Sequence, residues 1–450
     1  MKATKISSLI LMMALILFSA ISCKKDTSSP TPDPQPTNNG FTGLKVQEGF
    51  TWSTAEYLIL DLQFVDDADN PLATSFEVYS QFPGGVKFMD GASNANGTFY
   101  RKYKIANYRS SVTVVIPNQA PVVIGFDKIN TQIGNLTSTA FQAKQTIMVS
   151  NPGFKSVAEE TYQYYPAEGQ FGTISFEDTW PHTADYDFND VVLDYNVLGT
   201  FNDDNEVTKI NMVLYLRASG ANAMNGHGNG VGISFKHSWS WDGPYADIAS
   251  VTVNGETVAQ EATNYASFIL IDNVEDYQKT FNTFANQAFI EPTRFEVEII
   301  FNTPAEDWWE VELPLNNIFI FDALNRAREI HLPWCMPTSL VDPEFAGFDK
   351  DFSDSIAFDP TNFKAGNMVV GYYTYMTEEG YPWAINLYFD EAGDNLFRYP
   401  VEYMDIREAY APAFAGWVEN WDPDDWFLPE YRVEGKVYET IPDPVYPEMQ

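Results

Sequence analysis

The chain has 450 residues, of which 45% are hydrophobic and 15% aromatic. This composition can bury sizeable cores and excludes a chain that is disordered throughout, and the length favours two domains. The formal net charge is −36, because 62 Asp and Glu residues outnumber 26 Lys and Arg residues. A surface of this sign repels phosphate groups and disfavours nucleic acid as a partner, whereas it suits cations, basic partners or simple solubility.

Residues 1–22 have the features of an export signal. Residues 1–5 carry two lysines, and the apolar run at residues 9–18 is too short for a comfortable membrane span. Small or neutral residues then lead to Cys23, a pattern that resembles the lipobox of bacterial lipoproteins. The resemblance implies cleavage before Cys23 and lipidation of its thiol, and so a lipid anchor in the outer membrane or at the cell surface. The alternative is an ordinary secretory signal with an incidental cysteine.

Residues 23–40 are rich in Pro and Thr. After Cys23, the prolines are the only side chains in this segment that could contribute to a core. We expect an extended, disordered tether that could span roughly 50 Å at about 3 Å per residue. Such a spacer is typical of a module displayed at a surface.

Residues 41–150 contain short strands separated by turn residues. The clearest strand signals are at residues 57–65, 74–79 and 111–116. The acidic segment at residues 66–70, before Pro71, is explained by the preference of Asp, Asn and Pro for turns. The alternative interpretation of this segment is a calcium-binding loop. Regular spacing without a helical period predicts an Ig-like β-sandwich. A polar segment at residues 150–168 predicts a domain boundary.

Residues 165–446 predict a larger β-rich domain, like a β-sandwich or jelly roll, with a short C-terminal helix. Its strand signals lie at residues 171–176, 191–197, 209–216 and 294–301, with a hairpin turn at residues 202–205. Asp405 and Glu408 match a helix capping box, and Pro412 should kink or restart the helix. The fold class expected for the whole chain is therefore mainly β.

An acidic segment joins two of these strands. Glu177 and Asp178 end the first strand, and four further oxygen-bearing side chains precede the second, namely Asp185, Asp187, Asn189 and Asp190. In an extended loop the side chains at 185, 187 and 189 would lie on one side and the rings of Tyr186 and Phe188 on the other. Ca²⁺ takes six to eight oxygen ligands, which carboxylates, the Asn189 amide, backbone carbonyls and water could supply. The segment therefore predicts a calcium site.

The alternative is a turn in which these side chains only cap backbone N–H groups. The spacing is not that of an EF-hand, because Asp190 stands at the sixth position and Asn196 at the twelfth. Mutual repulsion of five acidic groups favours the cation.

The segment from Trp180 to Tyr195 also resembles the signature of LruC-type domains of bacterial surface lipoproteins. Three further blocks match in order, namely residues 216–221 with 229–233, residues 329–333 with 337–338, and residues 382–386 with 399–400 and 406–417. The resemblance covers about residues 165–440 and implies an all-β, surface-exposed lipoprotein without assigned catalytic residues. An insertion at residues 221–229 and the pair Trp334–Cys335 depart from the pattern.

No catalytic constellation is found in the sequence. The four histidines do not have HExxH spacing, a GxSxG motif is absent, and the two cysteines, Cys23 and Cys335, do not form a CxxC pair. We therefore expect a non-enzymatic surface lipoprotein, stabilised by Ca²⁺, that serves adhesion, scaffolding or ligand display, with a glycan or protein as its ligand. The alternative function is carbohydrate binding or glycan processing, in which Trp239 and Trp241 would stack on sugars.

Overall fold

The structure is a computed structural model that places the body of the chain in one compact unit, Asn39–Gln450. It describes residues 43–47, 50–133, 136–150, 160–182, 184–220, 228–235, 247–261, 266–278, 282–285, 287–305, 317–333, 335, 337–342, 345, 375–377, 379–391, 396–438 and 446. The predictions for residues 1–40, including Cys23, and for Trp239 and Trp241 concern positions outside these residues.

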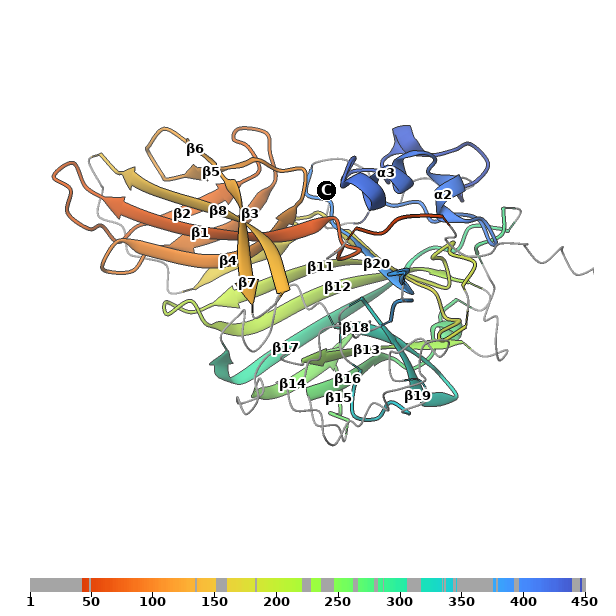
Figure 1. The fold of residues 1–450 in the computed structure, drawn as a ribbon. Coiled ribbons are helices and arrows are strands. Elements are labelled where there is room, and N and C mark those ends of the chain that lie inside the picture. The colour runs from red at the N-terminus through yellow and green to blue at the C-terminus, as the bar shows by residue number, and fades with distance from the viewer. Residues whose placement is uncertain are drawn as a thin grey trace, which may run out of the picture. The chain divides into compact units, whose positions relative to one another are not determined.

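Strands dominate the described chain, and the two labelled α-helices belong to its C-terminal part (Figure 1). The strands of the N-terminal part are β1 (Ala55–Val65), β2 (Ser75–Tyr79), β3 (Lys87–Ala92), β4 (Thr98–Ala106), β5 (Ser111–Val115), β6 (Val122–Gly125), β7 (Asp127–Ile133), β8 (Leu136–Met148) and β9 (Thr161–Tyr165). The remaining strands are β10 (Gly172–Phe176), β11 (Val191–Phe201), β12 (Val207–Ser219), β13 (Asn229–Phe235), β14 (Ile248–Val253), β15 (Glu256–Val258), β16 (Ala266–Ile271), β17 (Thr293–Ala305), β18 (Ile318–Asp322), β19 (Asn325–His331) and β20 (Ala384–Leu387). The helical elements are η1 (Val274–Asp276), α2 (Ile406–Ala409), α3 (Ala413–Asn420) and η5 (Pro429–Tyr431).

Three sheets are formed by the described strands. The largest has twelve strands, with the order β15-β14-β17-β12-β11-β9-β3-β2-β5-β6, and β10 and β20 attach to it through β11. The two smaller sheets have the orders β4-β1-β8-β7 and β16-β13-β18-β19. Most pairs are antiparallel, but β1 and β8 are parallel, so the chain must cross over between them.

The N-terminal strands form two layers that enclose aromatic side chains. Strand β2 buries every second residue, as a half-exposed strand should. Phe76 from β2 stacks on Phe64 of β1 at a ring-centroid distance of 4.8 Å and meets Phe99 of β4 at 4.9 Å. Gly91 on β3 is required here, because a Cβ atom at this position would come within 2.5 Å of the Phe76 ring.

Strand pairing continues across the segment that the sequence treats as a boundary. Strand β9 lies within residues 150–168 and pairs with β3 on one side and β11 on the other. A single cluster of buried hydrophobic residues extends from Leu44 to Tyr438. The division into residues 41–150 and 165–446 stays a prediction.

The start and the end of the described chain contact each other. Ser53 bridges to Asn386 in β20, and the Thr54 N–H donates to the Asn386 carbonyl at 3.1 Å. Trp52 donates its indole N–H to the Gly380 carbonyl at 2.8 Å. Late strand β20 and the residues before β1 are therefore parts of one packing unit.

The structure confirms a mainly β fold with a short C-terminal helix. Asp405, the first residue of the predicted capping box, is the N-cap of α2, where its side chain accepts from the Arg407 N–H, and Pro412 directly precedes α3. The acidic turn after β1 is held by Asp66, whose Oδ1 accepts from the N–H groups of Ala68 and Asn70. Among the described residues, no helix combines the length and apolar character that crossing a membrane requires.

Candidate metal centre

The acidic segment lies where β10 ends and β11 begins. These two strands pair in antiparallel register, so that Phe176 lies opposite Val191. Glu177 follows Phe176 directly and Asp190 precedes Val191, so the strand pairing brings both ends of the segment together. The folding of a simple strand pair thus concentrates acidic side chains in one place.

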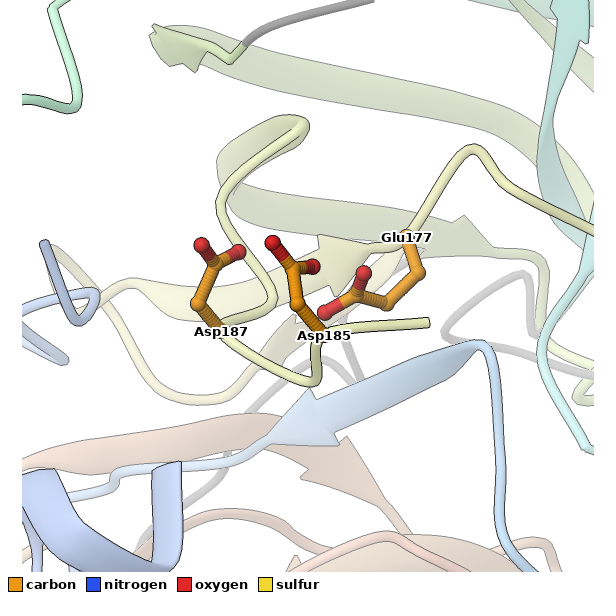
Figure 2. A group of neighbouring side chains, drawn as sticks. All are labelled: Glu177, Asp185 and Asp187. Carbon is orange, nitrogen blue, oxygen red and sulfur yellow. The ribbon is translucent and has the colours of Figure 1, made fainter. Parts of the chain in front are cut away.

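Three carboxylates converge within this segment. One oxygen each from Glu177, Asp185 and Asp187 lies within 4.8 Å of the other two. Figure 2 shows these carboxyl groups turned towards one another, with that of Asp185 drawn between the other two. Glu177 and Asp187 are fully buried, with exposed fractions of 0% and 1%, whereas Asp185 is half-buried.

The loop is not extended at Tyr186 and Phe188, so the backbone conformation assumed for the predicted alternation of its two sides is not the one found. Tyr186 and Phe188 have φ angles of 61° and 53°, in the left-handed region that non-glycine residues rarely occupy. Hydrogen bonds hold this conformation, because the Phe188 N–H donates to Glu177 Oε1 at 2.6 Å and the Ile406 N–H donates to the Tyr186 carbonyl at 2.9 Å. Both rings are buried in the core while Asp185 and Asp187 still meet Glu177.

The other three predicted ligands are buried beside this group and have partners of their own. Asn189 donates its amide to the Pro400 carbonyl at 3.1 Å. Asp190 Oδ2 accepts from the Asp178 N–H at 2.8 Å, and Asp178 Oδ2 accepts from the Asn229 amide at 3.0 Å. Each of these contacts uses one polar atom of the side chain, namely Asn189 Nδ2, Asp190 Oδ2 and Asp178 Oδ2.

Three buried oxygen atoms are left without a hydrogen bond. Glu177 Oε2, Asp178 Oδ1 and Asn189 Oδ1 have no partner among the described residues. A buried oxygen that loses its water without gaining a donor costs on the order of 1–3 kcal/mol. Oxygen atoms of this kind are the ligands that hard cations prefer, so the side chains of the acidic segment fit Ca²⁺.

The charges act strongly on one another. Burial and the nearby charge of Asp185 raise the pKa of Glu177 well above its usual range. Burial, Asp185 and Glu177 do the same to the pKa of Asp187, and burial with Asp178 does so to the pKa of Asp190. Burial raises the pKa of Asp178 to about 6, an effect that Asn229 and Arg328 oppose. Without a cation, the Glu177 and Asp185 carboxyl groups can form a hydrogen bond only if one of them holds a proton.

The surroundings of the acidic segment also include two parts of the chain that the sequence analysis did not predict. The Tyr403 N–H donates to Asp187 Oδ2 at 2.7 Å, and the charge of Glu402 acts on Asp187. Arg328 on β19 donates to the carbonyls of Asp178 and Trp180 at 2.8–3.0 Å. The signal that could have found the first part is the block around residues 399–406. No local signal marks Arg328.

Slightly less than half of the chain is matched by a family model. The family is described as Domain of unknown function (DUF4842), and the matched residues are 205–427. The match includes Asn229, Arg328 and Tyr403 but begins after the acidic segment. No curated protein matches the chain.

Some solved structures are similar at a low level. The crystal structure of 3-chlorocatechol 1,2-dioxygenase from Rhodococcus opacus 1CP is 10% identical, with 24% of this chain and 64% of that chain covered and a TM-score of 0.15. BcpA, the major pilin subunit of Bacillus cereus, is 10% identical, with 60% and 65% covered and a TM-score of 0.13. The chain thus spans slightly less than two thirds of the length of these structures. Scores of this size carry no argument about function.

Proposed function

We propose that this protein is a non-enzymatic, exported surface lipoprotein of LruC type whose β-fold is stabilised by Ca²⁺ at the acidic segment. The observation that carries the proposal is the convergence of Glu177, Asp185 and Asp187 within 4.8 Å, two of them fully buried. Five carboxylates in one interior region repel one another, and a bound cation removes that repulsion.

The donors favour Ca²⁺ among the hard cations. All of them are oxygen atoms, and Ca²⁺ binds oxygen at about 2.3–2.6 Å, so that its ligands lie up to about 5 Å apart. One oxygen atom from each of the three carboxylates falls within this span. Mg²⁺ retains several of its bound waters, so it is less suited to a site at which two of the three carboxylates are fully buried.

Adhesion, scaffolding or ligand display is the role that accords with these features. The lipobox resemblance at Cys23 and the Pro/Thr-rich residues 23–40 support display on a tether from the outer membrane or cell surface. The net charge of −36 supports a protein, glycan or cation as partner over nucleic acid.

Calcium binding is tested by calorimetry on the full chain after treatment with a chelator. We expect Asp187→Asn to lose the ion bound by Glu177, Asp185 and Asp187, and Asp203→Asn, which removes the same charge from an exposed turn, to retain it. At a calcium concentration about 100-fold above Kd, the free energy of unfolding should rise by about 2.7 kcal/mol. Identical thermal unfolding in calcium and in EDTA would contradict the proposal.

The lipid anchor has a separate test. In cells labelled with a radioactive fatty acid, the chain should carry the label and sediment with membranes. Cys23→Ala should lose the label and leave the membrane fraction, because a lipid chain contributes about 0.8 kcal/mol per buried CH₂ group. A variant that keeps its label and its membrane location would disprove anchoring at Cys23.

A further inference from the structure

We infer that the acidic cluster holds two divalent cations, the second of them between Asp178 and Asp190. The inference rests on the proposed calcium site and extends it from one ion to two. The acidic cluster is defined by five carboxylates, those of Glu177, Asp178, Asp185, Asp187 and Asp190.

The first argument is the geometry of a second carboxylate pair. Glu177, Asp185 and Asp187 form the three-carboxylate group, whereas Asp178 and Asp190 meet on their own. The Asp190 side chain reaches the backbone N–H of Asp178 at 2.8 Å, and both side chains are more than nine-tenths buried, with exposed fractions of 7% and 8%. Among the charges that act on Asp190, that of Asp178 is the strongest.

The second argument is an unpartnered oxygen at this pair. Asp178 Oδ2 accepts from Asn229 at 3.0 Å, but Asp178 Oδ1 has no hydrogen-bond partner among the described residues. The Asn229 amide fixes the orientation of the Asp178 carboxylate and leaves one oxygen for another ligand. Because a buried carboxylate oxygen requires a donor or a cation, this atom points to a bound ion.

The third argument is the balance of charge. The five carboxylates carry a formal charge of −5, and Arg328, whose charge acts on Asp178, reduces the sum over these six groups to −4. One divalent cation leaves half of this charge uncompensated in a buried region, whereas two divalent cations cancel it. Uncompensated charge in the interior is costly, so the second ion is favoured.

The number of bound ions decides the question. We would titrate the chelator-treated full chain with Ca²⁺ in 150 mM salt and determine the stoichiometry by calorimetry and by native mass spectrometry. We expect two ions in the wild type and one in Asp178→Asn. In this variant the amide oxygen can take the place of Oδ2 and still accept from Asn229, while an amide nitrogen replaces the unpartnered oxygen. Asp190→Asn should behave in the same way, and Asp203→Asn should keep both ions.

The possible outcomes separate the two proposals. One ion in the wild type, unchanged in Asp178→Asn, would overturn the second ion and leave the calcium site intact. Two ions in both proteins would place the second ion elsewhere on the acidic surface and also overturn the inference. No bound ion would contradict the calcium site itself. If the variants fail to fold, the stoichiometry of the wild type still decides between one ion and two.

Discussion

Replacing Arg109 with alanine is expected to lower the free energy of unfolding by about 3–5 kcal/mol, the usual cost of leaving a buried charge without its partner. Arg109 Nε donates to Asp390 Oδ1 at 2.8 Å, and its Nη2 donates to the Asp390 carbonyl at 2.8 Å. The Asp390 side chain is fully buried and that of Arg109 is 13% exposed. The variant leaves Asp390 with only the Tyr108 hydroxyl and the Ala106 N–H as described donors.

The pH dependence of this loss has a defined sign. Burial raises the pKa of Asp390, and Arg109 is the main influence that opposes the rise. Removing Arg109 raises this pKa further, so in the variant the carboxyl takes up a proton at a higher pH. Because a neutral carboxyl needs no counter-charge, the difference in stability should be largest at neutral pH and should shrink as the pH falls.

Chemical denaturation followed by circular dichroism at several pH values measures both effects. The control is Lys144→Ala, which breaks an ion pair of 2.7 Å with Asp61 on the surface, where the lysine side chain is 74% exposed. Such a pair contributes about 0–1 kcal/mol. Equal losses in the two variants would show that Arg109 contributes no more than a surface charge.

Replacing Trp417 with alanine is expected to cost a similar amount, about 3–5 kcal/mol, because it leaves a cavity in the core. The ring lies on α3 and is fully buried. It contacts Phe50 at a centroid distance of 4.7 Å and Trp426 at 5.4 Å, and it meets Trp52 at 5.9 Å. This side chain therefore joins the C-terminal helices to the residues before β1.

The matched control for this site is Trp417→Phe. The indole nitrogen of Trp417 is buried and has no hydrogen-bond partner among the described residues, so its loss removes an unfavourable group along with some packing. We expect the phenylalanine variant to lose much less stability than the alanine variant when both are unfolded with urea. Comparable losses would mean that a phenyl ring restores none of the packing of the indole, which would contradict this prediction.

The features that sequence analysis could predict are those encoded by neighbouring residues. Strands β1, β2 and β5 follow from alternation of apolar residues, and α2 from the capping residue Asp405. The three converging carboxylates lie within eleven residues of one another, so one strand pair is enough to collect them. The shape of their loop could not be predicted, because contacts with residues 400–406 impose the left-handed conformation of Tyr186 and Phe188.

For the same reason, the partners that Asp178 finds in distant parts of the chain could not be predicted from the sequence. Asn229 is 51 residues from Asp178, and Arg328 is 150 residues from it. An asparagine at the start of one strand and an arginine on another have no local pattern that would identify them as part of an acidic site. Their roles arise from the packing of β13 and β19 near the end of β10, and such packing is set by the whole sequence.

The contact between the residues before β1 and those after β20 can form only after most of the chain has been synthesised. The Thr54 hydroxyl donates to the Tyr388 carbonyl, a residue 334 positions later. A ribosome adds roughly 5–20 residues per second, so the early segment waits for its partner for roughly 15–70 s. During that interval the nascent chain presents Trp52 and the neighbouring apolar strands without the cover they have in the finished fold. A chain interrupted anywhere before residue 386 would keep them uncovered, and so would be a substrate for chaperones and proteases.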